Sequence, residues 1–135
     1  MKELKLRAEA KELEKVQAFV RREMEAANCP LKAVSQVEIA VEEIYVNIAH
    51  YAYPSGDGEV TIRCAVSREE GKVLIQFLDK GIPFDPLAKE DADTSLPARE
   101  RPIGGLGILM VKKMMDEVTY RCEDGKNILS MVKNL

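Results

Sequence analysis

Glu43 and Asn47 lie four positions apart, and their side chains suit joint chemistry. On a helix this spacing places both side chains on one face, one turn from each other. An amide oxygen is a hard ligand suited to Mg²⁺, and a carboxylate can position or deprotonate an attacking hydroxyl. The same pair also occurs on many solvated helices, so taken alone it leaves a purely structural role open.

Asp79 is a second candidate, because it ends the apolar run 72–79 and is followed at once by Gly81 and Pro83. An Asp at the end of a strand is often only a turn-former. We expect the strand Val73–Leu78 to be buried on both faces, and a buried carboxylate must find a donor. The exocyclic amine of a purine is one candidate donor, and Gly81 would leave space for the flat ring.

Gly104, Gly105 and Gly107 form a glycine-rich turn that opens an apolar segment, with Leu106 between the last two. Glycines let consecutive backbone N–H groups approach an anion, and a helix N-terminus adds a favourable partial charge for phosphate. The turn is not a Walker loop, since no Gly-Lys-Ser or Gly-Lys-Thr follows it. A flexible hinge that permits tight helix packing is the alternative explanation.

Hydrophobic periodicity predicts the elements that must position these residues. They are, in order, a strand or helix start at 2–8, with the strand favoured, helices at 9–27 and 31–53, strands at 60–66 and 72–79, a helix at 106–115, and strands at 118–122 and 128–132. Asp124-Gly125 between the last two strands is a type I′ hairpin signal. The order predicts an α/β two-layer sandwich, with helices on one face of a mixed, mostly antiparallel sheet.

Residues 80–103 show no sustained period and contain several prolines and charges, so we expect a long surface loop. Loops longer than about 12–15 residues within a compact domain are usually functional, often as lids. After this loop, we expect the methionines at 110, 114 and 115 to fill the core. We interpret His50, the single histidine, as a hydrogen-bonded spacer rather than a catalyst.

The composition fits one domain spanning residues 1–135. The net charge is −3, from 20 basic and 23 acidic residues, and no basic stripe is interleaved with aromatics, so no nucleic-acid partner is expected. No apolar run approaches the roughly 20 residues that a bilayer span needs. The charged N-terminus is unlike a signal peptide, so we expect a cytoplasmic protein that is not in a membrane.

The three cysteines, Cys29, Cys64 and Cys122, are odd in number and widely spaced, with no Cys-x-x-Cys pair. This pattern argues against a structural zinc site and against a disulfide framework. We therefore expect three small apolar residues in a reducing compartment.

Three motifs together resemble the N, G1 and G2 boxes of the GHKL ATP-binding superfamily. They are, in order, Glu43-x-x-x-Asn47, Asp79-x-Gly81-x-Pro83-Phe84-Asp85, and Gly104-Gly105-x-Gly107. The match is closest to the anti-sigma factor serine/threonine protein kinases and covers nearly the whole chain. The resemblance implies a Bergerat ATP-binding fold, with ATP and Mg²⁺ as cofactors.

The resemblance also implies a role for each matching residue. Asn47 would coordinate Mg²⁺ that bridges the ATP phosphates, and Glu43 would be the general base for a serine or threonine hydroxyl. Asp79 would accept from the adenine amino group, with Gly81 beside the ring. The Gly105-Leu106-Gly107 turn would hold phosphate. Residues 86–103 would form the ATP lid.

One departure concerns the last hairpin. Many relatives carry a Thr after its Gly, supporting the adenine pocket, whereas this chain reads Gly125-Lys126-Asn127. Asn127 is therefore a candidate substitute for that Thr.

By the same resemblance, the partners would be a STAS-type anti-sigma factor antagonist and a sigma factor, and the chain would act as a homodimer. Phosphorylation of the antagonist would control the sigma factor by partner switching. An alternative is an ATP-dependent protein-binding module that transfers no phosphate. A sensor histidine kinase is disfavoured, because the sequence shows no helix pair carrying a phosphoacceptor histidine.

Overall fold

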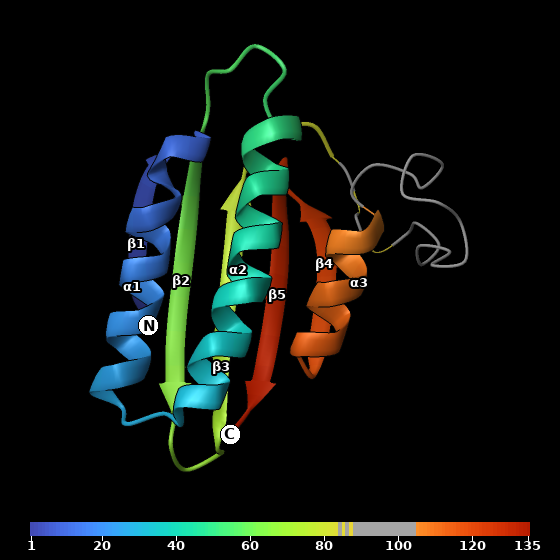
Figure 1. Cartoon of the computed structure of the whole chain (residues 1–135). Helices are drawn as coiled ribbons and strands as arrows, with labels where there is room; N and C mark the ends of the chain where they lie inside the picture. Colours follow the sequence, from blue (N-terminus) through green and yellow to red (C-terminus); the bar gives the residue numbers. More distant parts are fainter. Residues whose placement is uncertain (84, 86, 88–104) are drawn as a thin grey trace.

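A computed structural model of the chain describes residues 1–83, 85, 87 and 105–135 (Figure 1). The elements are β1 (Lys2–Arg7), a 3-10 helix (Ala10–Glu12), α1 (Leu13–Ala26), α2 (Leu31–Tyr51), β2 (Glu59–Ser67), β3 (Lys72–Asp79), α3 (Gly105–Met114), β4 (Glu117–Glu123) and β5 (Lys126–Asn134). Every element predicted from periodicity is present, and residues 2–7 form the favoured strand. Most of the predicted lid lies outside the described residues.

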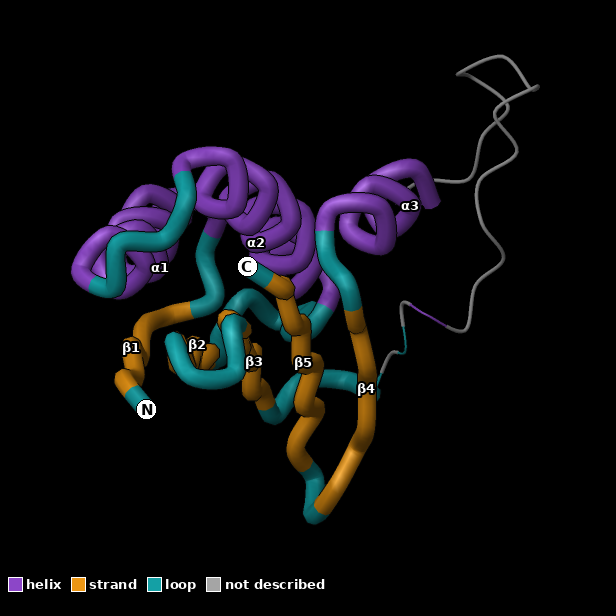
Figure 2. Tube along the Cα trace, turned by 90° about the horizontal axis from the view of Figure 1, so that it is seen from below, coloured by secondary structure: helices purple, strands orange, loops and turns teal. Residues whose placement is uncertain are grey.

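The five strands form one sheet in the order β1-β2-β3-β5-β4, and each of its four pairings is antiparallel. β3 and β5 are neighbours although the loop, α3 and β4 separate them in sequence. All three α-helices cover the same face of this sheet (Figure 2). The two-layer sandwich predicted from the element order is confirmed.

The core fills the space between helices and sheet, and strand alternation decides which residues enter it. On β3 the side chains of Val73, Ile75, Phe77 and Asp79 are buried, whereas the side chains between them are only half-buried. The expectation that residues 73–78 are buried on both faces is therefore wrong. Its physical reason is that no described helix covers the second face of the sheet.

The two long helices differ from their predicted bounds at one end each. α1 begins at Leu13 rather than residue 9, because Ala10–Glu12 form a 3-10 turn first. α2 ends at Tyr51 rather than Tyr53, and the residue before a proline, here Pro54, is disfavoured in helical conformation. The shortened end of α2 leaves Ala52 and Tyr53 free to contact the end of β3.

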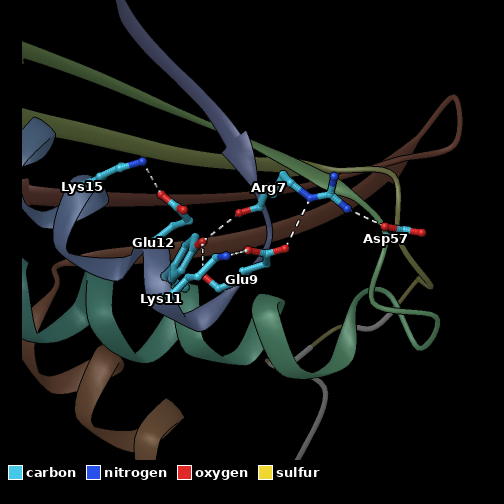
Figure 3. A network of polar contacts seen from close by, with 7 residues as sticks. Arg7, Glu9, Lys11, Glu12, Lys15 and Asp57 are labelled. Atoms are coloured by element: carbon cyan, nitrogen blue, oxygen red, sulfur yellow. Dashed lines mark hydrogen bonds and ion pairs between the residues drawn. The ribbon is translucent and has the colours of Figure 1, made fainter.

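A polar network joins the first strand to α2 (Figure 3). The fully buried Tyr45 donates its hydroxyl to the backbone oxygens of Glu9, at 2.7 Å, and Arg7, at 3.1 Å. Burial raises the pKa of Tyr45 to about 12. Around this contact lie the ion pairs Arg7–Glu9, Arg7–Asp57, Lys11–Glu9 and Lys15–Glu12. Tyr45 thus fixes the link between β1 and α1 onto the helix that carries Glu43 and Asn47.

The C-terminal hairpin turns at Asp124 and Gly125, whose φ angles are +53° and +75°. Two successive positive φ angles are what a type I′ turn requires, so the predicted hairpin is confirmed. Just before it, Met115 is buried and Met114 packs against the core, but Met110 is 36% exposed. The expectation that Met110 fills the core is therefore wrong.

The three cysteines are free and lie in different environments. Cys64 is buried, which raises the pKa of its thiol to about 12, and Cys29 is half-buried. Cys122 is exposed on β4, so the expectation of a small apolar residue fails there. None of the described helices is both long and apolar enough to cross a bilayer.

Candidate functional site

A pocket lies between the C-terminal half of α2 and the adjacent ends of β3 and β5. Its cavity volume is about 50 Å³. Its lining residues are Ile44, Asn47, Ile48, Tyr51, Ala52, Asp79, Ile82, Tyr120, Asn127 and Leu129. Two residues predicted from separate motifs, Asn47 and Asp79, therefore line the same pocket. The apolar side chains between them suit a flat, weakly polar ring.

Asp79 is a buried carboxylate, with 8% of its surface exposed. Its Oδ1 accepts from the backbone N–H of Gly81 at 2.8 Å and from the side-chain amide of Asn127 at 2.9 Å. No described residue donates to Oδ2. Since Asp79 lines the pocket and its Oδ1 is occupied, Oδ2 is the acceptor available to a ligand there.

Gly81 lies where the loop after β3 meets the end of α2. A Cβ at this position would overlap the backbone oxygen of Ala52, and that same oxygen accepts from the N–H of Ile82 at 2.8 Å. In the structure, the space left by the missing side chain is filled by Ala52. Only glycine permits this close packing of the loop on α2.

Asn127 is the second residue of β5, lies directly opposite Asp79 in the β3–β5 register and is 6% exposed. Its Nδ2 donates to Asp79 Oδ1 and, at 3.1 and 3.3 Å, to the backbone oxygens of Gly81 and Ile82. Its Oδ1 accepts from the hydroxyl of Tyr120. Sequence reasoning noted Asn127 only as a departure from a family pattern. The strand register is the signal that places it in the pocket.

Tyr53 is a second contributor that the sequence did not indicate. Its hydroxyl donates to the backbone oxygen of Glu59 at 2.6 Å and accepts from the N–H of Lys80 at 2.8 Å. Burial raises the pKa of Tyr53. The side chain therefore ties the segment after α2 to the start of β2 and the end of β3, next to Asp79.

Glu43 and Asn47 lie one turn apart on α2, as their spacing predicts, and both are half-buried. Neither side chain has a hydrogen-bond or ion-pair partner among the described residues. The carboxylate of Glu43 lies against Gly107, where a Cβ would overlap its Oε2. Glu43 thus faces the first turn of α3 while Asn47 lines the pocket, and both have polar groups available to a ligand.

α3 begins at Gly105 and packs against α2. The first N–H groups of a helix have no partner within the helix, and they carry partial positive charge. Gly105, Leu106 and Gly107 form this first turn, so the predicted glycine turn does open a helix. Gly104, Phe84 and the lid residues other than Leu87 lie outside the described residues. Backbone N–H groups at such a helix start can bind an anion, and here they lie next to Glu43.

Among the described residues, no cluster of three or more His, Cys, Asp or Glu side chains is placed to hold a metal ion. Mg²⁺ keeps several waters and is usually bound by one or two protein oxygens plus substrate phosphates. The unpartnered amide of Asn47 supplies such an oxygen.

His50 is exposed and does not line the pocket. Its ring stands edge-on to Tyr51, with centroids 6.1 Å apart. The side chain has no hydrogen bond to a described residue, so the expectation that His50 is hydrogen-bonded is wrong among those residues.

Residues 6–133 match the family described as the histidine kinase-like ATPase domain, and the chain belongs to that family. Among individual proteins, it is similar to the serine-protein kinase RsbW of Staphylococcus aureus, with 31% identity over 106 residues that cover 74% of this chain and 65% of the relative. It is also similar to RsbW of Listeria monocytogenes, with 27% identity over 103 residues, 73% of this chain and 64% of the relative. The chain therefore spans slightly less than two thirds of the length of these relatives.

Two solved structures share the fold. The RsbU and RsbW domains of a Mycobacterium tuberculosis protein superpose with a TM-score of 0.63 at 14% identity, covering 100% of this chain and 33% of that one. The histidine kinase domain of a blue-light activated histidine kinase from Erythrobacter litoralis gives a TM-score of 0.59 at 15% identity, covering 93% and 60%. At these identities the likeness establishes the fold alone.

Proposed function

We propose that the chain is a Mg·ATP-dependent serine/threonine protein kinase of the anti-sigma factor type. The observation that carries this proposal is the position of Glu43. Its carboxylate has no partner among the described residues and lies against Gly107 in the first turn of α3, one helical turn from Asn47. A base, a metal ligand and an anion-binding helix end therefore meet beside a pocket with a carboxylate acceptor.

ATP fits this arrangement with its base in the pocket and its phosphates toward α3. The adenine amino group would donate to Asp79 Oδ2, and the apolar residues of α2 would pack against the ring. The partial positive charge at the start of α3 would stabilise the phosphates. Mg²⁺, held by Asn47 and phosphate oxygens, would neutralise charge that develops during transfer.

The transfer step uses Glu43 as the general base. The hydroxyl oxygen of a protein serine or threonine attacks the γ-phosphorus, and a new P–O bond forms. The bond from the γ-phosphorus to the β–γ bridging oxygen breaks, and its electron pair leaves with ADP. Glu43 takes the hydroxyl proton.

The acceptor would be a STAS-type anti-sigma factor antagonist, and a sigma factor would be the second partner. The similarity to serine-protein kinases named RsbW supports a protein serine as the phosphoacceptor. In this scheme a homodimer of the chain holds the sigma factor or the antagonist according to nucleotide and phosphorylation state.

The first test is calorimetric titration of ATP, with and without Mg²⁺, into wild type, Asn47→Ala and Asp79→Asn. We expect Mg²⁺-dependent binding by wild type, loss of the Mg²⁺ dependence in Asn47→Ala, and loss of binding in Asp79→Asn. In Asp79→Asn, the amide N–H₂ would face the adenine amine, so a donor would meet a donor. A wild type without nucleotide affinity in any condition contradicts the proposal.

The second test measures phosphoprotein by intact mass with STAS-type antagonists as acceptors. Glu43→Gln should slow transfer by about 10²–10⁴-fold, the usual contribution of a general base, while ATP still binds. Glu42→Gln is the matched control, because Glu42 is the neighbouring acid on α2 and is exposed. ATP-dependent partner binding by a wild type that forms no phosphoprotein would instead identify a binding module.

A further inference from the structure

Asn127 has more hydrogen-bonding contacts than a residue that only closes a sheet. Three acceptors surround its Nδ2, namely Asp79 Oδ1 and the backbone oxygens of Gly81 and Ile82. Because an amide nitrogen can only donate and an amide oxygen can only accept, this environment fixes which end of the amide is which. The hydroxyl of Tyr120 must then donate to Oδ1 of Asn127.

These contacts form one directional chain, from the Tyr120 hydroxyl through the Asn127 amide to the Asp79 carboxylate. The chain ends on Oδ1 of Asp79, which also accepts from the N–H of Gly81. Two donors on the same oxygen set the rotation of the carboxylate and occupy that oxygen. The result is a pocket that presents Oδ2, an acceptor without a donor of its own.

We propose that Asn127, held by Tyr120, is a positioning residue that makes this pocket select a nucleotide base with an exocyclic amine. The inference rests on the proposed ATP site. Asn127 would act through Asp79 rather than by touching the base. Once the base covers the pocket, a base with an oxygen at the same place would put an acceptor against the Oδ2 acceptor. A base lacking the amine would leave Oδ2 shielded from water without a donor.

The position of Asn127 on β5 also separates this role from mere sheet closure. The same β3–β5 pair carries a second cross-strand contact on the opposite face, where Gln76 Nε2 donates to Ser130 Oγ at 3.1 Å. Gln76 and Asn127 therefore both link β3 to β5, but only Asn127 lines the pocket. Gln76→Leu is accordingly a matched control for Asn127→Leu.

The test compares the dissociation constants of ATP and purine riboside triphosphate, which lacks the exocyclic amine, by calorimetry on the full chain. For wild type and Gln76→Leu we expect a preference for ATP of about tenfold or more. For Asn127→Leu the preference should fall toward one, mostly through weaker ATP binding. The purine analogue should bind within about threefold of its wild-type affinity, since its triphosphate contacts are unchanged.

An Asn127→Leu protein that weakens both nucleotides equally, or that keeps the wild-type preference, would overturn the inference. If that variant does not fold by circular dichroism, Tyr120→Phe decides. It removes one hydroxyl from a half-buried side chain and should lower the preference for ATP by about threefold, whereas an unchanged preference overturns the inference. A wild type that binds neither nucleotide refutes the proposed function itself, which distinguishes the two failures.

Discussion

Where β3 and β5 meet, the polar side chains of the pocket bind one another, whereas on the α2 face toward α3 the polar side chains have no partner among the described residues. Asp79 and Asn127 are buried and joined by hydrogen bonds. On that face of α2, Glu43 and Asn47 are half-buried and have no partner among the described residues. Satisfied buried groups contribute to folding, while unsatisfied ones are available to a ligand. Substitutions where β3 meets β5 should therefore change stability, whereas substitutions on the α2 face toward α3 should change phosphotransfer or ligand binding.

Gly81→Ala tests the region where β3 meets β5 and should have the largest effect. A Cβ there overlaps the backbone oxygen of Ala52, and backbone cannot move aside as a side-chain tip can. We expect a loss of about 3 kcal/mol in the free energy of unfolding, the upper range for overpacking. Urea unfolding measures it. Gly71→Ala is the control for backbone strain alone, because its Cβ would meet nothing within 4 Å but its φ of +65° disfavours any residue other than glycine, at a cost of about 1–2 kcal/mol. A loss no larger than that of the control would mean that the loop does not need its tight contact with α2.

Gly107→Ala tests the contact between α2 and the first turn of α3. The added Cβ overlaps only the end of the Glu43 side chain, which can swing away. Stability should stay close to wild type, but the displaced carboxylate should slow phosphotransfer by about ten- to hundredfold. Initial rates with a phosphoacceptor, alongside urea unfolding, separate the two effects. A large loss of stability with normal turnover would mean that the α2–α3 contact serves folding, as the β3–β5 region does.

Tyr45→Phe tests α2 on the side away from the pocket, where hydrogen bonds are again satisfied. Loss of the hydroxyl leaves two backbone oxygens without their donor, so we expect about 1–2 kcal/mol of destabilisation at neutral pH. Phosphotransfer by the folded protein should not change. A slower transfer with unchanged stability would mean that Tyr45 positions Glu43 or Asn47.

The same variant carries a pH signature. The pKa of Tyr45 is raised from 10.0 to about 12, so the folded state holds the proton more tightly than the unfolded state. The associated stability is complete below pH 10 and is lost as the pH rises through 12. The difference in stability between wild type and Tyr45→Phe should therefore shrink over that range. Because the pKa of Cys64 is also raised to about 12, only this difference isolates the tyrosine.

Asn47→Ala should have the smallest effect on folding. The Asn47 amide has no partner among the described residues, and alanine has the higher helix propensity, so stability should rise by up to about 0.5 kcal/mol. The Mg²⁺ dependence of ATP binding should be lost at the same time. A clear drop in thermal stability without nucleotide would show that Asn47 has a structural partner after all.

Local pattern was enough to predict the elements and the faces of α2, because helix and strand periods are written in neighbouring residues. It also placed Asp124-Gly125 at a turn, since both residues tolerate positive φ. It missed the end of α2 by two residues and gave no role to Tyr53, whose hydroxyl reaches residues from two other strands.

Tertiary contacts set the limit of prediction for the pocket. Asn127 meets Asp79 across 48 residues of sequence, and the contact follows only from the pairing of β3 with β5. The approach of Glu43 to Gly107 likewise needs α2 packed on α3. Motif order pointed to both regions through resemblance, but the hydrogen-bonded floor of the pocket had no signal in any single window.

The insertion of β5 between β3 and β4 has a consequence for the order of events during synthesis. A nascent chain that has emerged only through β3 carries Asp79 without β5, the strand that supplies Asn127. The pocket is completed only when β5 arrives, after the helices and strands described before it in the chain. In the proposed site, nucleotide binding would therefore require the five-stranded sheet to be complete.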